Sequence, residues 1–196
     1  MNRMQATNIS MLKMSRSEGT GGFLDPESIS NEFGIKEGMA IADFGCGAGY
    51  FTAILSRKTG KSGRVYALDI QAEALENVSA KARKDDLANL QTIRTNLEIL
   101  GGSSLSNNSQ DIVLLANILF QSNKKKEIIQ EAARVLKKGG RAIIIDWKKG
   151  ANGFGPPENL RMTEADARSF AEQTGLIFVR EINAGNFHFG TTFIKK

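Results

Sequence analysis

The sequence predicts an α/β fold, a three-layer sandwich whose seven-stranded sheet is mostly parallel and ends in an antiparallel hairpin. From residue 39 onward, short apolar runs alternate with segments of helical periodicity, which is typical of βαβ units. Two β-rich segments close the chain at residues 176–182 and 187–194. Because only residues 183–186 separate them, there is no room for a crossover helix, and the two segments must pair as a hairpin.

Length and composition fit one compact domain. The chain has 196 residues, of which 41% are hydrophobic and 24% are charged, and no apolar run approaches the ~20 residues that a membrane helix requires. We expect residues 1–22 to form a mobile N-terminal arm that lacks the features of a secretory signal, and residues 23–196 to form a single domain. The single cysteine, Cys46, gives no disulfide framework and no cysteine-based zinc site, so we expect a cytoplasmic protein without a metal.

The parallel strands and their helices are expected in a regular order. The predicted strands are residues 39–43, 64–69, 90–94, 111–119 and 142–145. Apolar residues at helical spacing predict helices around residues 51–55, 75–82 and 128–136. The last of these should end with Lys137 and Lys138 in its final turn, before Gly139 and Gly140.

Capping signals mark two further helices. Asp25 and Pro26 supply an N-cap and a first-turn proline for a short helix that Gly34 ends. Thr163 and Asp166 have the spacing of a capping box, which predicts a last helix that Gly175 ends.

The strongest functional signal is a glycine-rich turn after the first strand. It reads Asp43-Phe44-Gly45-Cys46-Gly47-Ala48-Gly49 and opens a helix, so a ligand can approach the backbone closely and meet free N–H groups. A dinucleotide fingerprint has the spacing G-x-G-x-x-G, whereas here the third glycine comes one residue early, which argues against NAD. Asp43 would repel a pyrophosphate but could orient the cationic amino group of a bound amino acid.

A second signal is Asp69, at the end of the second strand. It lies roughly twenty residues beyond the glycines, where an acidic side chain can accept hydrogen bonds from both hydroxyls of a ribose. Either carboxylate alone could be a capping or turn residue. Together with the glycine turn, the two carboxylates indicate an adenosine-containing ligand.

These motifs resemble the class I S-adenosylmethionine-dependent methyltransferases, in the group that includes the ubiquinone and menaquinone biosynthesis methyltransferases. The resemblance covers roughly residues 21–196 and includes residues 111–117 and the turn at 136–141, which is similar to the family's L-K-P-G-G. It implies a Rossmann-like fold, S-adenosyl-L-methionine as cofactor, and a methyltransferase domain at residues 23–196. The cofactor-binding residues that it implies are Asp43, Gly45, Cys46, Gly47, Gly49, Asp69, Ile70, Asn96, Leu97 and Asn117.

The resemblance also assigns individual roles. Asp43 would help to hold the amino group of the methionine moiety, Asp69 the ribose, and Ile70 would flank the adenine. Asn96 stands where the family usually has Asp. Because an amide oxygen can still accept a bond from the adenine amino group, we expect weaker rather than lost binding.

Methyl transfer from an activated sulfonium mainly requires that the acceptor is held in line with the S–CH3 bond. A neutral hydroxyl or carbon acid also needs a base. His188, the only histidine, is the catalytic candidate because imidazole titrates near neutrality, and an ordinary strand histidine is the alternative. Residues 149–157, rich in glycine and proline, predict either a substrate-covering lid anchored by Phe154 or a passive connection.

The leading hypothesis is methyl transfer to a small-molecule acceptor at O, C or S. The lysines at 124–126 and Lys148 with Lys149 should lie at the carboxyl ends of the strands, which favours an anionic substrate, with solubility as the alternative. An RNA or protein methyltransferase and a non-catalytic S-adenosylmethionine-binding protein stay as alternatives. No N-P-P-Y-type motif follows the fourth strand, so a nucleic-acid partner is not favoured, and a homodimer is left open.

Overall fold

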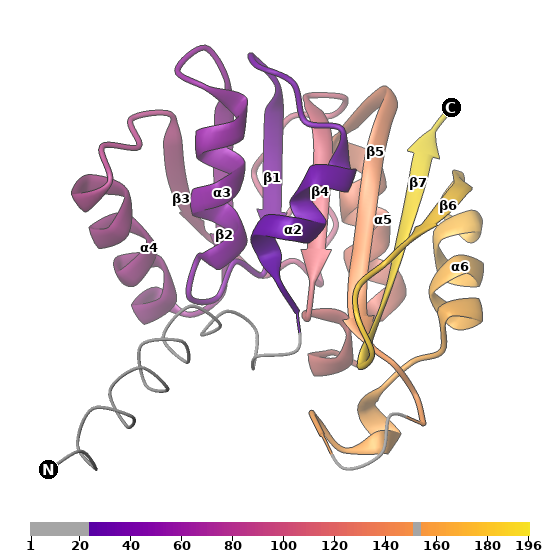
Figure 1. The fold of residues 1–196 in the computed structure, drawn as a ribbon. Helices are drawn as coiled ribbons and strands as arrows, with labels where there is room; N and C mark the ends of the chain where they lie inside the picture. Colours follow the sequence, from indigo (N-terminus) through magenta and orange to yellow (C-terminus); the bar gives the residue numbers. More distant parts are fainter. Residues whose placement is uncertain (1–23, 151–153) are drawn as a thin grey trace, which may run out of the picture.

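Strands from the whole length of the chain form one sheet in the order β3-β2-β1-β4-β5-β7-β6 (Figure 1). The computed structural model describes residues 24–150 and 154–196. The strands in these ranges are β1 (Ala40–Phe44), β2 (Arg64–Asp69), β3 (Leu90–Arg94), β4 (Gln110–Ala116), β5 (Leu136–Trp147), β6 (Leu176–Ile182) and β7 (His188–Lys195). The first five are parallel, and β7 is antiparallel to both β5 and β6. The expected parallel sheet with a terminal hairpin is confirmed.

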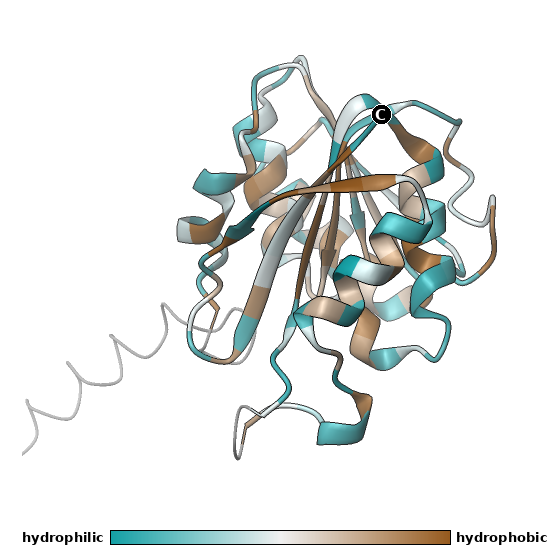
Figure 2. Ribbon diagram, turned by 90° about the vertical axis from the view of Figure 1, so that its right-hand side faces the viewer, coloured by the Kyte–Doolittle hydropathy of each residue, from teal (hydrophilic) through white to brown (hydrophobic). Residues whose placement is uncertain are grey.

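Helices cover both faces of this sheet, which gives three layers. One face packs against α2 (Pro26–Ser30), α3 (Tyr50–Thr59) and α4 (Ala72–Lys84), and the other against α5 (Lys125–Val135) and α6 (Glu164–Gln173). Three short 3-10 helices are η1 (Asn31–Phe33), η2 (Leu119–Gln121) and η3 (Glu158–Leu160). The central strands are apolar on both faces (Figure 2), as expected for parallel strands covered on both sides.

The face that carries α5 and α6 has no helix over β2 and β3. Residues 95–109, which connect β3 to β4, form turns and extended chain only. Helix α5 packs against β5, and α6 packs against β6 and β7. Tyr66 and Ile93, whose side chains lie on this face, are therefore only partly buried. This gap was not predicted from the sequence, because the residues singled out within 95–109, Asn96 and Leu97, concern the cofactor and not the packing of the sheet.

The two predicted helix caps are present. Asp25 Oδ1 accepts hydrogen bonds from the backbone N–H groups of Glu27 at 3.1 Å and Ser28 at 3.3 Å, and Pro26 opens α2. The capping box of α6 is reciprocal, since Asp166 N donates to Thr163 Oγ1 at 3.0 Å and Thr163 N donates to Asp166 Oδ2 at 2.9 Å. Both helices therefore start where the local signals placed them.

The boundary between α5 and β5 differs from the expectation. Helix α5 ends at Val135, and Leu136 already has extended backbone and begins β5, so Lys137 and Lys138 are not in a last helical turn. Leu136 is fully buried and pairs with Gln110 of β4. The expected helix ending at 136–138 was wrong because this pairing and burial outweigh the helix-end signal of the lysine and glycine residues.

Strand β4 is shorter than the expected 111–119. It ends at Ala116 because Asn117 has a left-handed backbone with φ of 55°. Leu119 and Phe120 then belong to η2, and their N–H groups donate to Asp146 Oδ2 at 3.0 Å and 3.2 Å. The apolar residues up to 119 predicted a longer strand. The backbone after β4 instead donates hydrogen bonds to the side chain of Asp146 on β5, which ends the strand pairing.

The expected N-terminal arm at residues 1–22 lies outside the described residues. Within the described ranges, no helix is long and apolar enough to cross a membrane.

A buried ion pair attaches the 95–109 connection to α5. Glu131, which is fully buried, accepts hydrogen bonds from the N–H groups of Gly101 at 2.7 Å and Ser103 at 3.0 Å. Arg134 donates to the same carboxylate from Nε at 2.8 Å and Nη2 at 2.7 Å. Burial alone would raise the pKa of Glu131, but these donors outweigh it and lower the pKa to about 2.

Replacing Glu131 with glutamine should lower the free energy of unfolding at pH 7 by about 3 kcal/mol, because Arg134 and two N–H groups lose a charged acceptor in a buried place. Since the folded pKa is below the unfolded one, the contribution of Glu131 is present above about pH 4.5 and lost as the pH falls toward 2. Urea unfolding at several pH values measures this. Glu127→Gln, an exposed site on the same helix, is the control, and equal losses in both variants would contradict the prediction.

Candidate functional site

The glycine turn after β1 is tied to the end of β2. The N–H groups of Gly45 and Cys46 both donate to the carbonyl oxygen of Leu68, at 2.8 Å and 3.0 Å. Gly47 N donates to Asp69 Oδ2 at 2.9 Å, and Gln71 N donates to Asp69 Oδ1 at 2.9 Å. Each carboxylate oxygen thus has one backbone donor and keeps a further lone pair for a ligand.

A pocket of about 280 Å³ opens at this point, at the carboxyl ends of β1, β2, β3 and β4. It is lined by Gly45, Gly47, Asp69, Ile70, Gln71, Thr95, Asn96, Leu97, Glu98, Ile118, Gln121, Ser122 and Ile128. Six of the expected cofactor-binding residues are in this lining: Gly45, Gly47, Asp69, Ile70, Asn96 and Leu97. Asp43, Cys46, Gly49 and Asn117 are not among the residues that line it.

The glycines of the turn meet two different needs. Gly47 has φ of 48°, and a Cβ built there would find no atom within 4 Å, so the space beside this backbone is open to the pocket. At Gly45 a Cβ would lie 2.6 Å from Ile118 Cδ1, so this glycine allows the turn to pack against the opposite wall. An open cradle next to a carboxylate fits a polar ligand such as an adenosine derivative.

Asp43 lies beneath the turn rather than in the pocket lining. Its side chain is buried, and Thr52 Oγ1 of α3 donates to its Oδ2 at 2.5 Å. Burial raises the pKa of Asp43 to about 7, although the hydrogen bond from Thr52 lowers it and the charge of Asp69 raises it further. Burial likewise raises the pKa of the Cys46 thiol, so this cysteine is an unreactive neutral group.

The opposite wall of the pocket includes Glu98 and Ser122, which the sequence analysis missed. Glu98 Oε1 accepts a hydrogen bond from Ser122 Oγ at 2.6 Å, which joins the segment after β3 to the segment after β4. Asn96 Oδ1 accepts from the N–H of Glu98 at 2.9 Å, so this amide orients its own loop as well as facing the pocket. The signal that could have located this wall is the position of residues 118–122 directly after the central strand.

Asp146, at the end of β5, is a second residue that the sequence analysis missed. It is buried, and its carboxylate accepts from the N–H of Trp147 at 2.7 Å as well as from Leu119 and Phe120. Burial raises its pKa to about 6, against the effect of these hydrogen bonds and of Lys125. Asp146 therefore fixes η2, and with it the Ile118–Ser122 wall, to the tip of β5.

Comparison with known proteins places this geometry in a family. A family model described as a methyltransferase domain matches residues 35–179. The chain belongs to this family. The expected membership in the class I S-adenosylmethionine-dependent methyltransferases is confirmed, and S-adenosylmethionine is the cofactor that the family implies.

Individual relatives agree with this assignment. A crystal structure of a SAM dependent methyltransferase from Aquifex aeolicus has a TM-score of 0.82 and 29% identity, and the match covers 95% of this chain and 98% of that one. The demethylmenaquinone methyltransferase of Lactococcus lactis is 32% identical over 113 residues, 58% of this chain. The ubiquinone/menaquinone biosynthesis C-methyltransferase of Klebsiella pneumoniae is 29% identical over 59% of this chain. The matches span only 44% and 45% of the length of these two relatives.

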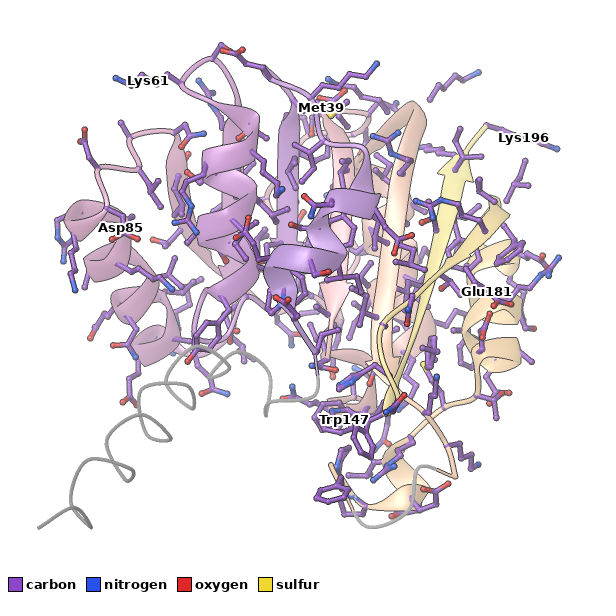
Figure 3. The ribbon with its side chains drawn as sticks, in the orientation of Figure 1. Met39, Lys61, Asp85, Trp147, Glu181 and Lys196 are labelled. Atoms are coloured by element: carbon purple, nitrogen blue, oxygen red, sulfur yellow. The ribbon has the colours of Figure 1, made fainter. Side chains whose placement is uncertain are left out.

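In this methyltransferase, His188 lies next to Trp147 at the carboxyl end of β5, where Figure 3 labels Trp147. The two ring centroids are 4.1 Å apart, His188 is fully buried, and neither of its ring nitrogens has a hydrogen-bond partner among the described residues. Burial lowers the pKa of His188 to about 4, and the charges of Lys148 and Arg161 lower it further. The expectation that it titrates near neutrality was therefore wrong, because a buried imidazole beside two cations stays neutral.

The segment that follows β5 in the methyltransferase is attached to the end of the sheet. Arg161 donates from Nε to the carbonyl of Pro156 at 2.9 Å and from Nη1 to the carbonyl of Lys148 at 3.0 Å, and its Nη2 donates to the carbonyl of Phe154. The ring of Phe154 lies 5.1 Å from that of Phe187, edge to face. Residues 151–153 lie outside the described residues, and the expected lid stays a prediction.

The basic residues expected at this end already have protein partners. Lys148 Nζ donates to the carbonyl of Gly185 at 3.1 Å, and Lys126 Nζ donates to Gln173 Oε1 at 2.8 Å. Lys124 Nζ lies 3.8 Å from Glu98 Oε2, and Lys125 Nζ donates to the carbonyl of Ser122 at 2.5 Å. Among these lysines, only Lys124 lies within 4 Å of a carboxylate oxygen in the described part of the chain.

The raised pKa of Asp43 predicts how the stability of the ligand-free methyltransferase depends on pH. Since its folded pKa is above the unfolded one, the folded state holds the extra proton, and stability falls by up to about 4 kcal/mol as the pH rises from about 4 to 7. Asp43→Asn should remove this slope and make the protein more stable than wild type at pH 8. Urea unfolding at pH 5 and pH 8 tests this, with the exposed Asp86→Asn as control. Parallel pH profiles for wild type and Asp43→Asn would refute it.

Proposed function

We propose that this protein transfers the methyl group of S-adenosylmethionine to a small-molecule acceptor at the carboxyl edge of its sheet. The observation that carries the proposal is the open cradle at Gly47, held beside the carboxylate of Asp69 by a 2.9 Å hydrogen bond. The match of residues 35–179 to the methyltransferase domain supports it. Labelled methyl transfer from S-adenosylmethionine to a panel of small acceptors is the direct test.

Different residues in and beneath the pocket would bind different parts of the cofactor. The remaining lone pairs of Asp69 would accept the ribose hydroxyls, and the exposed side chain of Ile70 would cover one face of the adenine. Asp43, beneath the turn, would favour the cationic amino group, whose approach lowers the pKa of this carboxyl again. When bound, S-adenosylmethionine supplies a methyl group on an activated sulfonium, so the chain needs only to orient the acceptor and handle a proton.

The acceptor would bind beside the pocket, over the ends of β4, β5 and β7. Trp147, Phe154 and Phe187 place aromatic rings around this end, which favours a planar acceptor. One named relative is a demethylmenaquinone methyltransferase and the other a ubiquinone/menaquinone biosynthesis C-methyltransferase, so a quinone-type ring methylated at carbon is our first choice. Lys148 supports an anionic substituent on it.

His188 is the residue of the chain best suited to handle the proton. It is neutral at ordinary pH, and both ring nitrogens lack a partner in residues 24–150 and 154–196. Leaving a buried polar group without a partner costs free energy, and an acceptor hydroxyl would supply the missing bond. A neutral imidazole can accept that proton as the new bond to the methyl group forms.

The cofactor assignment predicts the effect of Asp69→Asn. The variant loses the charge that accepts from Gly47 N and from the ribose, so the Kd for S-adenosylhomocysteine should rise about 10-fold or more. Isothermal titration calorimetry measures it. Glu73→Gln, an exposed carboxylate on the neighbouring helix, should bind like wild type, and NADH should give no signal. An unchanged Kd for Asp69→Asn would remove the basis of the proposal.

The proton-transfer role predicts a particular pH profile. Because the folded pKa of His188 is about 4, the rate of methyl transfer should show no step near pH 6.5 and should fall only as the pH approaches 4. His188→Gln should lower kcat by about 100-fold or more, while the affinity for S-adenosylhomocysteine stays the same. Asn186→Ala, on the exposed hairpin turn, is the control. A His188→Gln enzyme with full kcat would leave this histidine with a structural role only.

A further inference from the structure

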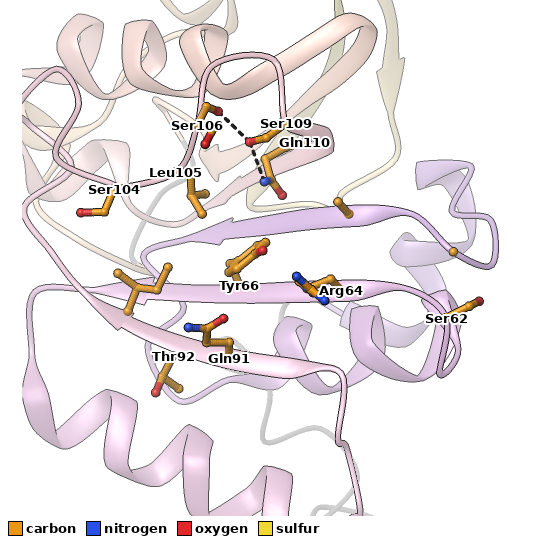
Figure 4. A pocket seen from close by; sticks show the side chains of 13 residues that line it. Ser62, Arg64, Tyr66, Gln91, Thr92, Ser104, Leu105, Ser106, Ser109 and Gln110 are labelled. Carbon is orange, nitrogen blue, oxygen red and sulfur yellow. Dashed lines mark hydrogen bonds between the residues drawn. The ribbon is translucent and has the colours of Figure 1, made fainter.

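A groove much larger than the cofactor pocket lies where the sheet has no helix, over β1, β2 and β3 (Figure 4). Its volume is about 770 Å³, and it shares no lining residue with the cofactor pocket. The floor is formed by side chains of the three strands, including Ala40, Tyr66 and Ile93, and the wall by residues 104–110. It begins at the amino ends of β1 and β2, so it is separate from the site of methyl transfer.

One buried polar atom in this groove has no partner. Gln110 is only 2% exposed, and its Oε1 accepts no hydrogen bond from any residue that the structure describes. The orientation of the amide is fixed, because Ser109 Oγ donates its single proton to the carbonyl of Ser106 at 2.6 Å. Ser109 Oγ can then only accept, so Gln110 must present Nε2 to it, at 2.9 Å. Figure 4 draws both bonds, with the free oxygen of Gln110 on the side of Tyr66.

A cation without an ion pair lies across the groove from this oxygen. The guanidinium of Arg64 is within 4 Å of no carboxylate in the described residues. Arg64 pairs with Ala40 of β1, and Gln110 precedes the part of β4 that pairs with β1 on its other side. Two strand spacings, about 10 Å, therefore separate the backbones of Arg64 and Gln110. Gly38 and Ala40, which have no side chain or only a methyl group, lie between Arg64 and Gln110 in the lining of the groove.

We propose that this groove binds a nucleoside monophosphate, independently of the proposed methyl transfer. Arg64 matches a phosphate through its planar fork of donors. The free Oε1 of Gln110 matches the exocyclic amine of a base, which is a donor. Tyr66, partly buried at the centre of the floor, supplies an aromatic surface for the flat base. The groove thus fits a ligand that carries an anionic group, a flat aromatic ring and an N–H donor.

Calorimetry with adenosine monophosphate tests the proposal, with the full chain saturated by S-adenosylhomocysteine so that the cofactor pocket is filled. Titration of S-adenosylhomocysteine alone reports on that pocket separately. We expect the nucleotide to bind, Arg64→Met to weaken binding about 10-fold or more, and Gln110→Met to weaken it about 5-fold. Arg168→Met, an exposed arginine on α6, is the matched control and should bind like wild type.

Two comparisons distinguish specific recognition of the nucleotide from non-specific attraction between its phosphate and the positively charged protein. Adenosine, which lacks the phosphate, should bind more weakly and should lose nothing further in Arg64→Met. Gln110→Met should change the unfolding midpoint little, because the lost hydrogen bond from Nε2 to Ser109 Oγ is offset by removal of a buried oxygen that has no partner. Absence of binding at about 1 mM nucleotide, equal losses in Arg168→Met, or binding that S-adenosylhomocysteine abolishes would overturn the proposal.

Discussion

The hydrogen bond from Gly47 N to Asp69 Oδ2 is the interaction on which the site depends. It joins the tips of two neighbouring parallel strands, and the two N–H groups that share the carbonyl of Leu68 strengthen the same junction. The turn is thereby held open on its ligand side, since Gly47 has no neighbour where a side chain would be. Because the strands are buried on both faces, the carboxylate of Asp69 is held in a fixed position at the end of β2.

The parts of the fold and site that the sequence predicted are those set by local chemistry. The glycine turn, Asp69 and both helix caps depend on residues a few positions apart, and each is found where its spacing indicated. The wall from Ile118 to Ser122 could not be found in this way, since it depends on Asp146 of β5 and on Glu98 of the segment after β3, which are distant in the sequence. The start of β5 was missed for the same reason, because the pairing of Leu136 with Gln110 is long-range.

Burial disfavours the charged form of three titratable groups at the site. The pKa values of Asp43 and Asp146 are raised and that of His188 is lowered, in each case first by burial. All three lie at one edge of the sheet, with Asp43 and Asp146 near the carboxyl ends of β1 and β5 and His188 at the start of the antiparallel β7. A cationic cofactor would change this balance, because it favours ionised carboxylates and a neutral imidazole.

The carboxylate of Asp146 connects the end of β5 with η2, which follows β4 beside the cofactor pocket. One oxygen accepts from the strand tip that carries Trp147, and the other from the two N–H groups at the start of η2. A shift of one region is consequently transmitted to the other instead of being absorbed by a flexible loop. We therefore expect a molecule that rests against the indole ring of Trp147 to alter how long the adenosine part of the cofactor stays bound.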